Sequence, residues 1–81
     1  MELKDTIEMM NSNDYKERFK AEYEQTKIRR DKLHNTLIKQ EAGVLNFELK
    51  CDPYLLKKQE AAMDEYLRLL EIRAAIEKID L

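Results

Sequence analysis

The sequence predicts an all-α protein, an antiparallel hairpin of two long helices preceded by a short one. Its 81 residues contain one Gly and one Pro, too few backbone breakers for a turn-rich β-sandwich or barrel. The segment 14–41 contains neither residue and is rich in strong helix formers. A second pattern of similar length follows the Gly-Pro region, as a hairpin of matched helices requires. The length allows one domain, which spans 1–81.

The short helix is expected at about 2–10, where Leu3, Ile7 and Met10 recur at helical spacing. The polar run 11–14 then competes for backbone hydrogen bonds and favours a break and a new N-cap. The long helix is expected at about 14–41. A frayed N-terminal segment is the alternative to the short helix.

The second long helix is expected at about 53–79. Asp52 can cap its N-terminus, and Pro53 suits the first helical position. The connector 42–52 alternates apolar and polar residues from Leu45 to Cys51, which is a strand period. Two interpretations stay open: an extended segment, which either covers the hairpin end or pairs with another subunit, or a loop that packs its apolar side chains, Cys51 among them, onto the core.

The apolar surface of the two helices predicts self-association. On the first helix one seam, which is not its only apolar surface, has steps of four and three residues: Phe19, Tyr23, Thr26, Arg30, Leu33 and Leu37. The second helix carries a broader band: Leu55, Leu56, Ala62, Met63, Leu69, Leu70 and Ile76. A two-helix hairpin covers one stripe on each helix, so the excess predicts a homo-oligomeric helical bundle.

Polar side chains lie among these apolar ones and are the candidate ligand-binding residues. Gln59, Tyr66 and Arg73 are spaced by seven along the second band. Arg30, with His34 one turn later and Tyr23 two turns earlier, lies on or beside the first seam. A buried guanidinium needs a partner. One interpretation is an interhelical polar network that fixes the register. The other is an anion pocket in which arginines hold phosphate, tyrosines contact a base or sugar, and His34 and Gln59 assist.

Composition and motifs argue against several functions. The net charge of −2 argues against nucleic-acid binding, and no apolar run is long enough for a membrane span or a signal peptide. One His, one Cys and no phosphate loop or metal-ligand spacing indicate no catalytic residue, no metal and no cofactor. The free thiol of Cys51 fits a reducing cytoplasm.

Two parts of the chain carry a resemblance to a known family. They are D-Y-K-E-R-F-K-A-E-Y at 14–23, followed by K-L-H and E-A-G, and the closing Q-x-x-x-M-x-x-Y-L-x-x-L-E-I-R-A at 59–74. With them, residues 14–81 resemble a family of small helical proteins of Firmicutes phages and prophages and of crAss-like phages. The resemblance implies a viral accessory protein in the host bacterial cytoplasm, where such proteins often counter immunity. In architecture alone the chain is similar to helical anti-CBASS sponges, which implies no binding residue.

These observations lead to one hypothesis and two alternatives. The hypothesis is a non-enzymatic, phage-encoded counter-defence protein that sequesters a nucleotide immune signal, such as a cyclic nucleotide, at the interface of a helical homo-oligomer. The first alternative is an inhibitor that binds a host defence protein, as anti-CRISPR proteins do. The second is a structural self-association module.

Overall fold

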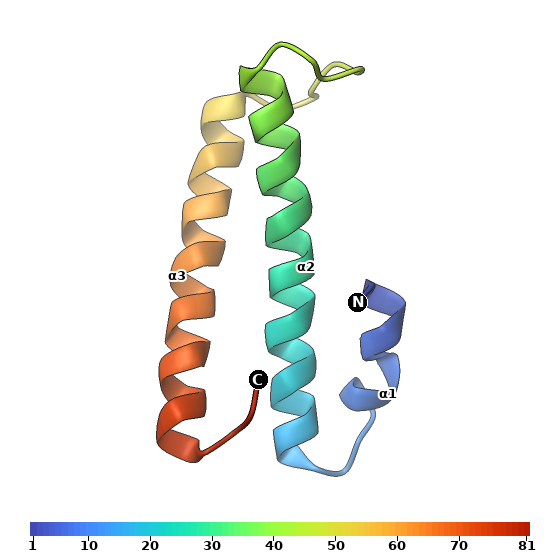
Figure 1. The fold of residues 1–81 in the computed structure, drawn as a ribbon, viewed down its shortest axis with the longest axis vertical. Coiled ribbons are helices and arrows are strands. Elements are labelled where there is room, and N and C mark those ends of the chain that lie inside the picture. Colours follow the sequence, from blue (N-terminus) through green and yellow to red (C-terminus); the bar gives the residue numbers. More distant parts are fainter.

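The protein is a helical hairpin with a short helical segment against one side, and the computed structural model describes residues 1–81 (Figure 1). The elements are η1 (Leu3–Thr6), α1 (Ile7–Met10), α2 (Tyr15–Glu41) and α3 (Pro53–Glu77). α2 and α3 run antiparallel along an axis of 43 Å. The all-α hairpin is therefore confirmed. No helix contains an apolar window that would let it cross a bilayer.

Side chains at the helix ends set where α2 and α3 begin and stop. Asp14 and Asp52 each accept a hydrogen bond from a backbone N–H of the first turn, from Lys16 and Tyr54 respectively. α2 ends at Glu41, and Gly43 two residues later has a φ of 75°, a conformation that glycine adopts without strain. The capping residues expected from the sequence therefore act as caps.

α3 ends differently from the expectation, at Glu77 rather than Ile79. Lys78 adopts the left-handed conformation, with φ 58°, and turns the chain back toward α2 (Figure 1). The N–H of Ile79 then donates to the carbonyl of Ala74 at 2.9 Å, and the Ile79 side chain is buried. This is a helix stop with its usual apolar contact, made by lysine where glycine is the common residue.

The core lies along the α2–α3 contact and is small. Phe19, Leu70, Ala74 and Ile79 form a buried cluster, and Tyr23 packs against it. Leu37 and Leu67 are also buried. Only eight of the 81 side chains are buried, so the hairpin leaves much apolar surface exposed.

The N-terminal segment covers a second face of α2, on the side away from α3 (Figure 1). Thr6 is fully buried there, and its hydroxyl accepts a hydrogen bond from the Gln25 amide at 3.1 Å. Ala21, one turn before Gln25, is buried as well. The predicted short helix is present, as a 3₁₀ turn followed by one α-helical turn.

Within this chain the connector contains turns and bends but no strand, and its pairing with the same segment of another subunit stays a prediction. Leu45 and Leu49 are half-buried, and Phe47 stays 58% exposed. Cys51 is exposed too, so the prediction that it packs onto the core is wrong. The alternation fails to make a strand because no second extended segment in the chain offers backbone partners.

Candidate binding site

The predicted site residues lie along the hairpin in two groups. Arg30, Tyr23 and His34 lie on α2 at its contact with α3, whereas Gln59, Tyr66 and Arg73 are exposed on α3. Arg30 is level with Asp64, nine residues from Arg73, or about 13 Å along the helix. Within one chain the two arginines therefore do not converge on one phosphate.

The first group forms a ladder of hydrogen bonds between α2 and α3. Tyr23 Oη donates to Glu71 Oε2 at 3.0 Å, Arg30 Nε donates to Asp64 Oδ1 at 2.6 Å, and His34 Nδ1 lies 2.9 Å from Glu60 Oε2. Each step along α2 is matched by an equal step backward along α3. The ladder therefore fixes the antiparallel register.

Arg30 is the more enclosed of the two arginines. Its side chain is 26% exposed and has a second carboxylate, Asp31, at 3.3 Å. The hydrogen bond to Asp64 raises the pKa of the guanidinium further above its ordinary value. Arg30 thus has its charge compensated within the chain, as the network interpretation expects.

Arg73 belongs to a more open cluster near the end of α3. Its side chain is 50% exposed, and its guanidinium lies 4.9 Å from the ring centroid of Phe19. Arg73 Nη2 donates to Tyr15 Oη at 2.7 Å, and Arg73 Nε donates to Glu77 Oε2 at 3.3 Å. Tyr15 Oη donates in turn to Glu77 Oε1 at 3.0 Å. A cation therefore stacks on one aromatic ring and bonds to another at the protein surface.

Tyr66 lies two turns before Arg73 on the same side of α3 and is 41% exposed. The pKa of its phenol is raised above the ordinary value. The larger cause is a hydrogen bond with Glu22, and the second is partial burial. For Tyr23, burial is the larger cause of the raised pKa, and the hydrogen bond to Glu71 is the second. Gln59 is exposed two turns before Tyr66.

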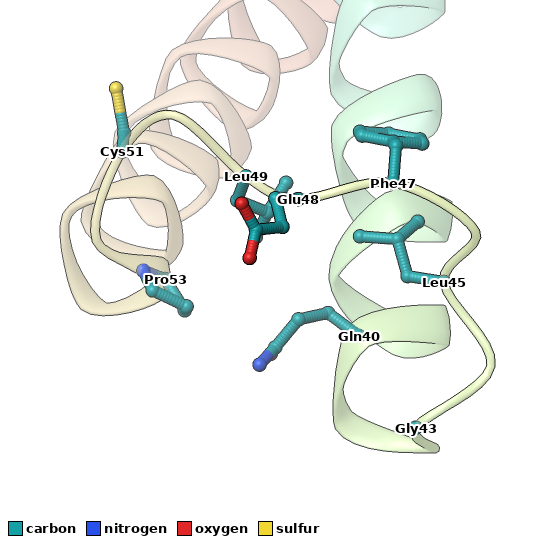
Figure 2. Close-up of a pocket in the computed structure, with 8 residues that line it drawn as sticks. All are labelled: Gln40, Gly43, Leu45, Phe47, Glu48, Leu49, Cys51 and Pro53. Atoms are coloured by element: carbon teal, nitrogen blue, oxygen red, sulfur yellow. The ribbon is translucent and has the colours of Figure 1, made fainter.

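The largest hollow lies elsewhere, between the connector and the helix ends, with a volume of about 490 Å³ (Figure 2). Gln40, Leu45 and Glu48 point into it, whereas the thiol of Cys51 points away. Its lining contains no Lys, Arg or His and none of the six predicted residues. It is therefore poorly suited to a phosphate group.

A smaller hollow of about 300 Å³ is lined partly by His34, Lys57 and Glu60. The carboxylate of Glu41, which pairs with Lys57 across the hairpin, also lines it. That pairing lowers the pKa of Glu41 below its ordinary value. The charged and titratable side chains that line this hollow thus pair with one another, Lys57 with Glu41 and His34 with Glu60.

Sequence reasoning missed Tyr15 and Phe19 as companions of Arg73. Matched helix lengths place the start of α2 beside the end of α3, and this signal was available in the sequence. The fold and its exposed side chains define a class, a small helical hairpin with cations and aromatic rings along its helices. Side chains of these kinds are suited to binding.

Comparison with known proteins agrees with that class. A family model described as Sequestin matches residues 13–76, a range that includes the connector and nearly all of both long helices. The chain belongs to the Sequestin family. The family name suggests a sequestering role, that is, binding rather than catalysis. No curated protein and no solved structure matches the chain.

Proposed function

We propose that this protein is a non-enzymatic phage accessory protein that sequesters a nucleotide immune signal in the host bacterial cytoplasm. The ligand is a cyclic nucleotide or a related signal molecule, held at the interface of a helical homo-oligomer. Membership of the Sequestin family supports a sequestering role. The phage setting follows from the sequence resemblance described above.

The observation that carries the proposal is the exposed Arg73, which bonds to the exposed Tyr15, lies over the buried ring of Phe19 and is two turns from Tyr66. A nucleotide offers phosphates, which a guanidinium binds in a planar, two-bonded geometry, and a base, which stacks on aromatic rings. Arg73 is half exposed, so a phosphate can replace Glu77 as its partner without opening the core.

The proposal gives the six predicted residues different roles. Arg73 binds phosphate, Tyr66 contacts the base or sugar, and Gln59 hydrogen-bonds the ligand from the same side of α3. Arg30, Tyr23 and His34 already bond to carboxylates of α3, so they hold the hairpin that presents the site.

Calorimetry tests this with a panel of cyclic di- and trinucleotides and ADP-ribose derivatives. Arg73→Gln is compared with Arg68→Gln, whose side chain is 67% exposed and bonded only to Glu65 on its own helix. A charged hydrogen bond is worth about 1.5–3 kcal/mol, so Arg73→Gln is expected to weaken binding about tenfold or more. Arg68→Gln is expected to leave it unchanged. The absence of binding at high micromolar protein, or equal losses in both variants, contradicts the proposal.

A second function, inhibition of a host defence protein, is favoured by the exposed apolar residues of α3, including Leu55, Leu69 and Ile76. Purification of the tagged protein from a host lysate distinguishes the two. A stoichiometric host protein in the eluate, together with no nucleotide binding, favours inhibition.

A further inference from the structure

α3 carries a second stripe of side chains, all of them exposed, from which Tyr66 and Arg73 bond to side chains of α2. It advances by alternating steps of four and three residues, and every member is exposed: Leu55, Gln59, Ala62, Tyr66, Leu69, Arg73 and Ile76. The mean step of 3.5 residues is the spacing of a coiled-coil seam. We call this set the outer stripe.

The outer stripe differs from the set of α3 residues that is buried against α2. That inner stripe consists of Leu56, Met63, Leu67, Leu70 and Ala74, all buried or half-buried. At about 100° per residue, the two stripes lie roughly a quarter-turn apart on the helix. α3 therefore has two packing faces, and the hairpin fills one.

We infer that a second copy of this chain covers the outer stripe, with α3 packed antiparallel to α3 of that copy. The stripe spans three heptads from Leu55 to Ile76, about 32 Å at 1.5 Å per residue. Two hairpins joined in this way form a four-helix bundle, an arrangement that buries both faces of α3.

Charge favours the antiparallel direction. Arg73 is the only charged member of the outer stripe. Parallel helices in register place Arg73 beside the same residue of the partner, which costs energy because two like charges meet in a partly desolvated contact. An antiparallel pair that crosses near Asp64 keeps the two Arg73 side chains about 27 Å apart.

Side-chain size favours the same crossing point. Ala62 is the smallest member of the outer stripe, and Tyr66, one turn later, is the largest. An antiparallel crossing near residue 64 places Tyr66 of each copy over Ala62 of the other, so a large knob meets a shallow hole. The contact is isologous, because two-fold symmetry repeats it in both directions.

This interface deepens the proposed function, since it places Gln59 of one copy about one turn from Arg73 of the other, so that both copies contribute to each of two nucleotide sites. In that respect it rests on the proposed function. The dimer itself is tested without any nucleotide, so the two ideas fail separately.

Cysteine cross-linking tests the crossing point in a Cys51→Ser background, which removes the exposed native thiol. A tagged chain with Ala62→Cys is mixed with an untagged chain with Tyr66→Cys and oxidised. The expected product is the mixed disulfide dimer. The control replaces Tyr66→Cys with Arg68→Cys, which lies on another exposed side of α3, and is expected to give no dimer. Equal cross-linking of both pairs, or of neither, overturns the inference.

Sedimentation gives a second measurement on uncross-linked protein. Leu69→Glu places an unpaired charge in the outer stripe and is expected to weaken the dimer about a hundredfold or more, with unchanged helicity in circular dichroism. Arg68→Glu is the control and is expected to sediment as wild type does. If the wild-type protein sediments as a monomer at high micromolar concentration, the inference is overturned, whether or not the protein binds nucleotide. An intact dimer that binds no nucleotide overturns the proposed function alone.

Discussion

Two adjacent leucines of α3 allow a direct test of the packing. Leu70 is 1% exposed and belongs to the buried cluster, whereas Leu69 is 48% exposed on the outer stripe. Replacement of a fully buried leucine by alanine costs about 2–5 kcal/mol, because transfer energy is lost and a cavity remains. A half-exposed leucine in the monomer contributes about 1 kcal/mol or less. In dilute protein, Leu70→Ala is therefore expected to lower the free energy of unfolding much more than Leu69→Ala does.

The size of the effect matters because the domain is small. Roughly 0.05–0.15 kcal/mol per residue gives a free energy of unfolding of roughly 4–12 kcal/mol for this chain. Leu70→Ala therefore removes a large fraction of it and is expected to leave a partly unfolded population.

Urea unfolding followed by far-ultraviolet circular dichroism measures both variants at two protein concentrations. The loss for Leu70→Ala is expected to be present at both. The loss for Leu69→Ala is expected to grow with concentration, because a dimer gains stability by mass action. A dilute Leu69→Ala variant that is less stable than Leu70→Ala would refute the assignment of the two faces.

Three further predictions concern single residues of the hairpin. Arg30→Met is expected to change the free energy of unfolding by less than about 1 kcal/mol in either direction, since water can solvate the half-exposed carboxylates of Asp31 and Asp64 once their partner is gone; a loss above about 2 kcal/mol in urea unfolding contradicts it. Lys78→Gly is expected to stabilise by about 0.5–1 kcal/mol, since it relieves a left-handed residue, whereas Lys58→Gly within α3 lowers stability by about 1 kcal/mol. The raised pKa values of Tyr23 and Tyr66 contribute stability that is present below about pH 10, the unfolded tyrosine pKa, and is lost above it; ultraviolet absorbance during alkaline titration is expected to show two late-ionising phenols, which the Phe variants remove.

The positions of the long helices were predictable because their signals are local. A capping carboxylate at Asp14 and Asp52 fixes each start through bonds to the first turn, and Gly43 permits the left-handed residue that ends α2. Lys78 gives no such local signal. Its left-handed conformation depends on the burial of Ile79 against Phe19 and Leu70, a contact that exists only after the hairpin forms.

The connector shows a different limit. Its period of two is a valid strand pattern, but a strand also needs a neighbour for its backbone groups, and neighbours are a property of the fold. The exposure of Phe47 and Cys51 follows from the same fact, because the connector forms a loop and not a layer over the core.

The broad apolar band of α3 was visible in the sequence, but its division into two stripes was not. Leu69 and Leu70, like Leu55 and Leu56, are adjacent and chemically identical. Only the position of α2 decides which leucine of each pair is covered. The grouping of the polar residues follows from the same geometry, since Arg30 of α2 lies at the contact with α3 and Arg73 lies on the outer stripe.

The two arginines also differ in what a ligand must displace. Arg30 is mostly enclosed between two aspartates, so a phosphate there must compete with charges that the fold holds within 2.6 and 3.3 Å. Arg73 pairs with Glu77 in a half-exposed setting, and exposed pairs of this kind are worth only about 0–1 kcal/mol. A phosphate that replaces Glu77 leaves the ring of Phe19 against the guanidinium and frees Tyr15 Oη to bond to the ligand. The lower cost of exchange makes Arg73 the better anion-binding residue.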